Sequence, residues 1–419
     1  MPSTDVNRTI DAVWRIESGR LIAGLSRMTG DVGLAEDLAQ EALVAALESW
    51  PRDGVPPKPG AWLMTTAKNR AIDGMRRDER LARKQEEIGR DLERRAAAEP
   101  AEPAPDEIGD DLLSLIFTCC HPVLSREARV ALTLRMLGGL RTEEIARAFL
   151  VPSPTIGQRI SRAKRTLAEE GVGFEVPAGD ELAERFPPVL EVIYLIFNEG
   201  YTATAGDDWM RPALCEDALR LGRILAGLAP REAEVHGLAA LMEIQASRIG
   251  SRTDRSGDPI LLLDQDRSRW DRLLIGRGLA ALERAEALQR DPGPYALQAA
   301  IAACHARART AEETDWKRIA ALYDQLSMLA PSPVVELNRA VALSMAFGPE
   351  AGLDLVDQIA ATKALDGYHL LPSVRGDLLA KLGRDEEARR EFELAASLTE
   401  NERVRALLLA RAAGSESGA

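Results

Sequence analysis

Six polar or basic side chains that can hydrogen-bond to nucleic acid lie close together between positions 155 and 165. They are Thr155, Gln158, Arg159, Ser161, Arg162 and Arg165. Side chains of these types contact phosphate oxygens and base edges in protein–DNA complexes. These side chains can bind a partner non-covalently. To do so, all six must be presented toward that partner by one secondary-structure element.

The apolar residues of the same segment recur with helical spacing. Ile156, Ile160, Ala163 and Leu167 are separated by four, three and four positions. This spacing places them on one buried face of a helix and leaves the six polar residues on the open faces. The segment is therefore predicted to be the recognition helix of a DNA-binding motif.

A first, shorter helix is expected just before it. Thr142 can cap this helix, and the two glutamates that follow suit its positive N-terminal end. Pro152 ends the first helix, and Ser153 is predicted to cap the second, which begins near Thr155. Two helices joined by a tight turn, the second of them basic, form a helix-turn-helix.

The local charge of this motif is opposite to that of the chain. Positions 141–165 carry six basic and two acidic residues, whereas the whole chain has a net charge of −13. Phosphate contacts supply most non-specific affinity for DNA, so a partner is expected to bring this acidic protein to its site. The alternative is that the basic residues only solvate a surface helix.

Composition predicts an all-α fold. Alanine, leucine, arginine and glutamate dominate the 419 residues, and only 4% are aromatic. The N-terminus lacks the pattern of a signal peptide, and four cysteines without a paired framework fit a reducing compartment, so a cytoplasmic location is expected, with no membrane partner.

The sequence offers no signature of catalysis. It has no Walker loop, dinucleotide-binding glycine pattern or nucleophile elbow, so we expect no enzyme activity and no cofactor. Cys119, Cys120 and His121 are adjacent and point in different directions on a helix, so no metal site is predicted. The polar cluster at 248–270 is predicted to be a salt-bridged turn, with a small-ligand or docking site as the alternative.

Breaks in composition divide the chain into six parts. The expected parts are a helical domain at 1–85, an acidic Pro/Ala-rich linker at 86–110, the helix-turn-helix domain at 111–171, a short linker at 172–185, a helical extension at 186–315 and helical hairpins at 316–413. The last part has small and aromatic residues at tetratricopeptide-like spacing, namely Gly376, Leu379, Ala388, Phe392 and Ala395. Non-repeating helical hairpins would give a similar pattern.

Two further groups of polar residues lie in the first domain. Asp37, Gln40 and Glu41 are predicted to share one helical face, opposite an apolar stripe of Leu34, Leu38 and Val44, and to meet a basic partner helix or merely solvent. The second group supplies phosphate contacts and base-edge donors, except for its tryptophan, which is expected to favour core packing. Its members are Trp62, Lys68, Asn69, Arg70, Arg76 and Arg77.

Taken together, the first 170 residues resemble an extracytoplasmic-function sigma factor of the sigma-70 family. GDVGLAEDLAQEALVAALESW resembles the region 2 helix that docks on the clamp helices of the largest RNA polymerase subunit, and PGAWLMTTAKNRAIDGMRR resembles the segment that reads the minus-10 element. LSREARVALTLRMLGGLRTEEIARAFLVPSPTIGQRISRAKRTL resembles region 4, which reads the minus-35 element and touches the flap of the second-largest subunit.

The resemblance assigns roles to the three groups of residues. It implies core polymerase binding for the Asp37 group, minus-10 recognition for the Trp62 group with Asn69 nearest a base, and minus-35 recognition for the Thr155 group. Gly157 and Ser161 depart from the region 4 pattern, since relatives often have basic or bulky residues there. The minus-35 sequence is therefore expected to differ from the usual one.

The function implied is that of a sigma factor that directs transcription initiation on core RNA polymerase. The C-terminal extension is expected to regulate it, through contact with the sigma domains or with a protein partner. The alternative is a helix-turn-helix transcriptional activator with a repeat-built sensor domain, which would leave the first domain unexplained.

Overall fold

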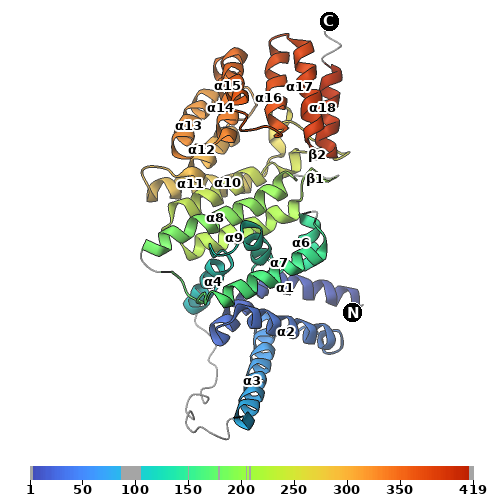
Figure 1. The fold of residues 1–419 in the computed structure, drawn as a ribbon, viewed down its shortest axis with the longest axis vertical. Coiled ribbons are helices and arrows are strands. Elements are labelled where there is room, and N and C mark those ends of the chain that lie inside the picture. The colour runs from blue at the N-terminus through green and yellow to red at the C-terminus, as the bar shows by residue number, and fades with distance from the viewer. Residues whose placement is uncertain are drawn as a thin grey trace. The chain divides into compact units, whose positions relative to one another are not determined.

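The computed structural model describes residues 3–85, 105–149, 151–177, 180–203, 205–206 and 209–414 (Figure 1). Across these ranges the regular structure is helical except for one pair of two-residue strands, β1 (Ala205–Gly206) and β2 (Glu400–Asn401), which are parallel. The predicted all-α fold is confirmed. None of the described helices is long and apolar enough to cross a membrane.

The chain divides into two compact units, Met1–Val192 and Ile193–Ala419. The first unit contains both the region-2-like domain and the region-4-like domain. The boundary falls inside helix α8 (Asp180–Tyr201), so the first turns of the predicted extension belong to the first unit.

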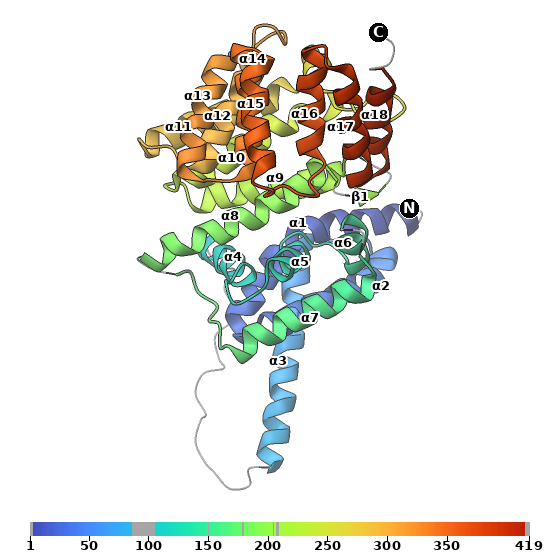
Figure 2. The same cartoon turned by 45° about the horizontal axis from the view of Figure 1, so that its top comes forward.

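Three helices form the region-2-like domain, α1 (Ser3–Thr29), α2 (Val32–Asp53) and α3 (Pro59–Gln85). Asp31 caps α2, because its Oδ1 accepts hydrogen bonds from the backbone N–H groups of Gly33 and Leu34 at 2.6 and 3.0 Å. Gly54, with φ +85°, ends the helix in a conformation that favours glycine. Figure 2 shows α3 projecting from α1 and α2 as one long helix.

Four helices form the region-4-like domain, α4 (Pro105–Cys119), α5 (Arg126–Met136), α6 (Thr142–Ala148) and α7 (Ser153–Glu169). Because α4 begins at Pro105, the predicted linker is wrong for its last six residues, 105–110, which are helical. The apolar residues of α4 from Leu112 through Phe117 are buried, and α4 packs mainly against α1. This burial favours a helix over a linker. The rest of the predicted linker, 86–104, lies outside the described residues.

The second unit is built from helices that pack mainly against their neighbours in sequence (Figure 2). After α8 these are α9 (Pro212–Leu228), α10 (Ala233–Ala246), α11 (Arg272–Leu288), α12 (Pro294–Arg307), α13 (Trp316–Leu329), α14 (Pro333–Phe347), α15 (Pro349–Ala361), α16 (Leu370–Lys381), α17 (Asp385–Leu398) and α18 (Glu402–Gly414). Short 3₁₀ turns at Ile249–Ser251, Leu262–Asp264 and Arg267–Arg269 connect α10 to α11.

Small residues let the helices of the last hairpins approach closely. A Cβ on Gly376 would lie 2.9 Å from the Phe392 ring, and one on Gly352 would lie 2.7 Å from the carbonyl oxygen of Ala340. Ala388 and Phe392 are buried in the core that these helices share. The packing explains why glycine and alanine occupy these positions, while the tetratricopeptide assignment stays a prediction.

The polar cluster at 248–270 connects two helices, α10 and α11, as predicted, and its Asp258 forms an ion pair with Arg403 at 2.7 Å, but ion pairs do not satisfy its buried arginines. Its buried arginines bind carbonyl oxygens at helix ends. Arg267 donates to the carbonyls of His305 and Ala308 at 3.0 and 3.2 Å, and Arg252 donates to the carbonyl of Tyr201. The last carbonyls of a helix lack partners within the helix and carry partial negative charge, so they satisfy these guanidinium groups.

Gly278 and Gly276 provide a matched test of close packing in α11. A Cβ at position 278 would lie 2.5 Å from Ile244 Cγ1 and 3.1 Å from the carbonyl oxygen of Ala240, whereas one at 276 would have no atom within 4 Å. We expect Gly278→Ala to lower the free energy of unfolding by about 1–3 kcal/mol. Gly276→Ala should raise it by up to about 1 kcal/mol. Thermal unfolding measures both, and equal stability of the two variants would contradict the packing of α10 on α11.

Candidate nucleic-acid interface

Helix α7 presents its polar side chains outward over a buried apolar face. The buried residues of this helix are Ile156, Ile160, Ala163 and Leu167, as the spacing predicted. Of the six candidate DNA-binding side chains on α7, five are exposed and Arg159 is half-buried. The helix therefore offers a continuous polar surface to a partner.

The three arginines of this surface differ in whether a carboxylate of the protein lies near their charge. Arg165 forms an exposed ion pair with Glu169 at 3.6 Å, which is weak in water. Arg159 lies near Glu127, whose pKa is lowered mainly by hydrogen bonds at the start of α5 and further by this arginine. Arg162 is exposed and has no ion pair within the described part of the chain. It is the arginine most available to an incoming anion.

The ends of the two motif helices differ from the predicted caps. Pro152 takes the boundary position of α7 with φ −58°, so Ser153 is already helical and the predicted Ser153 cap is wrong. The start of α6 is satisfied by a glutamate, since the backbone N–H of Arg141 donates to Glu144 Oε2 at 2.8 Å. This is the carboxylate half of a capping box. The three-residue spacing of Arg141 and Glu144 is the sequence signal of this cap.

Gly157 lies near the start of α7, and the fold has room for a side chain there. A Cβ at this position would meet only Thr142 Cγ2, at an ordinary contact distance of 3.9 Å. Glycine inside a helix costs about 1 kcal/mol relative to alanine. Packing within the protein therefore gives no reason for glycine at this position.

Helix α3 carries the candidate minus-10 residues. Trp62 is half-buried and packs against the buried Trp50 with ring centroids 5.4 Å apart, which favours a packing role. Asn69 is exposed and Lys68 is half-buried. Arg70 donates to the carboxylate and the backbone carbonyl of Glu41, both at 3.0 Å, and so ties α3 to α2.

Arg76 and Arg77, the remaining candidates of this group, lie within α3. Their side chains fall outside the described residues, so their place in the interface stays a prediction.

Helix α2 exposes a mixed apolar and acidic stripe. Asp37 and Glu41 are exposed, and so are Leu34 and Val44, which lie on the same stripe at spacings of three, four and three. The predicted placement of Leu34 and Val44 on the opposite, buried side is therefore wrong, whereas Leu38 is buried. Gln40 is half-buried and faces away from this stripe, into a cavity.

Alanines explain why the leucine and valine point outward. The buried side of α2 is formed largely by small residues, Ala35, Ala39, Ala42 and Ala46, which allow α1 to pack closely. Their spacing of four, three and four marks a helix face as clearly as larger side chains do. Sequence reasoning missed Leu34 and Val44 as surface residues because it weighted side-chain size over spacing.

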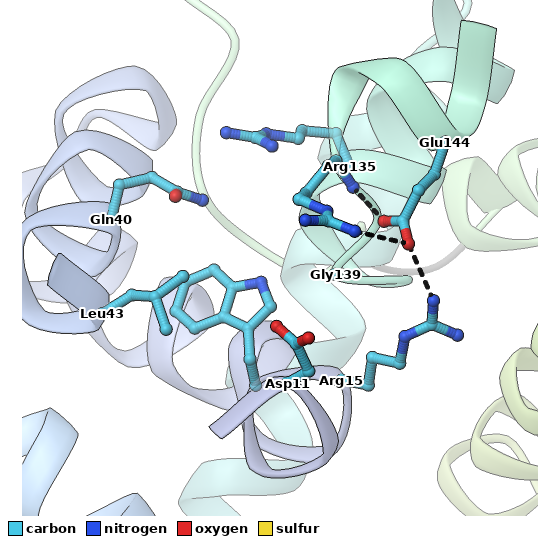
Figure 3. Close-up of a pocket in the computed structure, with 9 residues that line it drawn as sticks. Asp11, Arg15, Gln40, Leu43, Arg135, Gly139 and Glu144 are labelled. Atoms are coloured by element: carbon cyan, nitrogen blue, oxygen red, sulfur yellow. Dashed lines mark hydrogen bonds and ion pairs between the residues drawn. The ribbon is translucent and has the colours of Figure 1, made fainter. Parts of the chain in front are cut away.

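The cavity that Gln40 faces has a volume of about 120 Å³ and lies between the region-2-like and region-4-like domains (Figure 3). Gln40 and Leu43 line it from α2, and Arg15 and Glu144 face each other across its edge at 3.0 Å. Burial alone would raise the pKa of Glu144, but its hydrogen bonds to Arg141 and the charge of Arg15 hold the pKa below its usual value. The carboxylate is thus ionised and anchored between the two domains.

The adjacent Cys119 and Cys120 are buried in α4 and at its end. Burial raises the pKa of the Cys120 thiol to about 11, so it is not a thiolate at neutral pH. Among the described residues, no three His, Cys, Asp or Glu side chains are placed to hold a metal ion together.

An all-α protein whose helix-turn-helix turns the polar face of its second helix outward belongs to the DNA-binding proteins of transcription. Residues 15–81 match sigma-70 region 2, and residues 114–167 match sigma-70 region 4. Residues 185–286 match a family of unknown function (DUF6596).

Three relatives bear on this assignment. An uncharacterised protein of Rhizobium meliloti is 44% identical over 381 residues, which are 91% of this chain and 89% of that protein. The ECF RNA polymerase sigma factor SigL of Mycobacterium tuberculosis is 32% identical over 151 residues, which are 35% of this chain and 81% of SigL. The probable ECF RNA polymerase sigma factor SigI of the same species is 26% identical over 177 residues, which are 42% of this chain and 60% of SigI.

The chain therefore belongs to the extracytoplasmic-function sigma factors of the sigma-70 family. Members of this family are transcription initiation factors and not enzymes. The matches to regions 2 and 4 fall on α1–α3 and α4–α7, so the family's two domains coincide with the two domains of the first unit.

The variant Gly157→Ala should have opposite effects on the stability of the protein and on its contact with DNA. We expect this variant to be more stable by up to about 1 kcal/mol, because alanine removes the helix cost and meets no close atom. If the α7 backbone approaches DNA at this position, the added methyl group should lower promoter-dependent transcription in the same variant. Thermal unfolding and run-off transcription measure the two effects, with Gly276→Ala as a control that gains stability alone. Wild-type transcription by Gly157→Ala would show that this glycine has no role in DNA binding.

Proposed function

We propose that this sigma factor binds core RNA polymerase and directs initiation at specific promoters, with α7 on the minus-35 element and α3 on the minus-10 element. The region-4-like domain would also touch the flap of the second-largest subunit. The observation that carries the proposal is the polar outer face of α7, presented over its buried apolar face in a chain that also has a region 2 domain. The protein would act in the cytoplasm, where polymerase is.

Contacts of α7 with DNA would divide by residue type. Arg162 is exposed with no ion pair among the described residues, and it suits a base edge or a phosphate. Gln158 and Ser161 are exposed and offer both donors and acceptors. Since the chain has a net charge of −13, polymerase would have to hold the helix on the promoter.

The exposed stripe of α2 supports the polymerase contact. Leu34 and Val44 supply apolar area, and Asp37 and Glu41 supply negative charge beside it. A helix face of this kind docks on a partner helix that is apolar at its centre and basic at its edge. The clamp helices of the largest subunit would fill that role.

Residues of α3 would read the minus-10 element from the same domain. Asn69 is exposed and can form paired hydrogen bonds with a base. Its neighbour Arg70 already holds Glu41, so α3 would be positioned by α2 when α2 is bound to polymerase. Core binding and minus-10 reading would then be linked through the packing of α3 on α2, which includes this ion pair and the contact of Trp62 with Trp50.

The second unit would regulate the sigma domains, through contact with them or with a protein partner. Its stacked helices form a separate compact unit, and a relative from Rhizobium meliloti aligns over 91% of this chain, extension included. A protease site introduced between Pro177 and Asp180 of the full chain tests this proposal. Unchanged run-off transcription after cleavage would exclude a regulatory role for the covalent link.

Run-off transcription with core polymerase tests the proposed function directly. Arg162→Ala should lower minus-35-dependent initiation by the equivalent of about 1–3 kcal/mol and leave core binding unchanged. Arg277→Ala, an exposed arginine of α11, is the matched control and should transcribe normally. If the wild-type chain binds no core polymerase, the activator alternative would be favoured.

Replacing the exposed apolar residues of α2 should affect the polymerase contact alone. We expect Leu34→Asn with Val44→Asn to weaken core binding by about 1–3 kcal/mol, since each loses buried apolar area in the complex. Both side chains are about half-exposed, at 46% and 50%, so stability should change little. Titration of labelled core polymerase measures the affinity, and an unchanged value would place the docking face elsewhere.

A further inference from the structure

The buried polar atoms of the second unit that lack a hydrogen-bond partner are concentrated in one segment and in α12. Within the described part of this unit they belong to Gln265, Arg267, Trp270 and His305. Three of them are nitrogens, namely Arg267 Nε, Trp270 Nε1 and His305 Nδ1. A polar group that is buried without a partner loses its hydrogen bonds to water, so a cluster of such groups marks a place where a ligand atom can bind.

The side chains that carry these nitrogens contact one another. The guanidinium carbon of Arg267 lies 5.1 Å from the centre of the Trp270 ring, and Arg267 donates to the carbonyl oxygen of His305 at 3.0 Å. Arg248 lies over the same tryptophan ring, with its guanidinium carbon 5.6 Å from the ring centre. One tryptophan therefore contacts two arginines, and a buried histidine lies beside one of them.

The charge of this cluster is positive and is not balanced by carboxylates. Among the residues that the structure describes, Arg248, Arg252 and Arg267 form no ion pair. Burial and the charge of Arg248 lower the pKa of Arg252 to about 10. They also lower the pKa of Arg267, although Glu312 and Glu313 act in the opposite direction. Like charges in a buried cluster repel one another, and a bound anion relieves that repulsion.

His305 adds a polar group to the cluster without adding charge. Burial and the charges of Arg248 and Arg267 lower the pKa of His305 to about 3, so this histidine is neutral at pH 7. A neutral imidazole carries one N–H group. In the tautomer that is protonated at Nδ1, His305 therefore offers one further hydrogen-bond donor.

Arg248 is the arginine whose charge is most available to a ligand. Arg252 and Arg267 already donate to carbonyl oxygens at helix ends. Arg248 is half-buried and donates to the hydroxyl group of Tyr201. Its guanidinium group lies over the rings of Tyr201 and Trp270, and cation–π contacts with both rings hold it in place. A guanidinium group that is oriented in advance loses less freedom when it binds an anion.

We propose that segment 248–270 and the end of α12 form a binding site for the anionic group of a small ligand, a carboxylate or a phosphate. Arg248 would pair with the anion, and the N–H groups of Arg267, Trp270 and His305 would donate to its oxygens. Because Arg248 is half-buried and the other three residues are buried, the rest of the ligand would extend past Arg248 toward solvent. Gln265 Oε1 is an acceptor, so it has no part in this contact.

Titration of the full chain with sodium phosphate and, separately, with sodium acetate tests the proposal. Calorimetry and tryptophan fluorescence follow binding, with the ionic strength held constant by sodium chloride. We expect the wild-type chain to bind at least one of these anions. Arg248→Gln should weaken that binding by roughly tenfold or more, because a charge-assisted hydrogen bond is lost. Preference for phosphate would identify a phosphate ester as the ligand class, and preference for acetate would identify a carboxylic acid.

Two further variants separate binding from general effects of charge and packing. Arg255→Gln removes the same charge from an exposed position of the same segment, so it should bind the anion as the wild-type chain does. Trp270→Phe keeps an aromatic ring beside Arg248 but removes the Nε1–H donor, and it should weaken binding by roughly two- to tenfold. Circular dichroism checks that each variant is folded.

Undiminished binding by folded Arg248→Gln would overturn the proposal, and so would a wild-type chain that binds neither anion. Equal weakening in Arg248→Gln and Arg255→Gln would also overturn it, because the effect would then be one of net charge. If Arg248→Gln does not fold, Trp270→Phe decides in the same way. The test uses neither polymerase nor DNA, so failure of the anion site and failure of the proposed function are distinguishable.

Discussion

The close packing of α1 on the alanine side of α2 is the constraint on which the first unit depends. Ala35, Ala39, Ala42 and Ala46 occupy most of the buried side together with Leu38 and Trp50, and Leu34 and Val44 point outward. One side becomes the exposed stripe of leucine, valine and carboxylates. Another side brings Glu36 to the region-4-like domain. A single helix thereby provides both the surface proposed for polymerase and one of the contacts between the two domains.

Sequence patterns predicted α7 well and α2 poorly, and the difference is physical. In α7 the buried positions are large and apolar and the rest are polar, so periodicity alone gives both faces. In α2 the buried positions are mostly alanine and the exposed ones include Leu34 and Val44, so side-chain size points to the wrong face. Spacing of small residues was the usable signal.

Other features depend on partners that are distant in sequence, and no local pattern could reveal them. Glu36 and Arg135 are 99 positions apart, and Arg267 and His305 are 38 apart. An arginine-rich segment predicts ion pairs, but the guanidinium groups of Arg252 and Arg267 meet helix-end carbonyls instead. Those carbonyls belong to helices whose ends become neighbours of the segment only in the folded unit. The cap of α6 could have been predicted from local sequence, because Glu144 is only three positions from Arg141.

The pairing of Lys164 with Glu36 and Asp37 also bears on how the protein searches a genome. A lysine that is paired with carboxylates contributes little attraction to a DNA phosphate. Each phosphate contact that is lost makes the slope of log affinity against log salt concentration less steep by about 0.9. Non-specific DNA is present in vast excess over any promoter. If part of the charge of α7 is neutralised in the free sigma factor, the protein would bind non-specific DNA more weakly. A larger fraction of the sigma factor would then be free to bind polymerase.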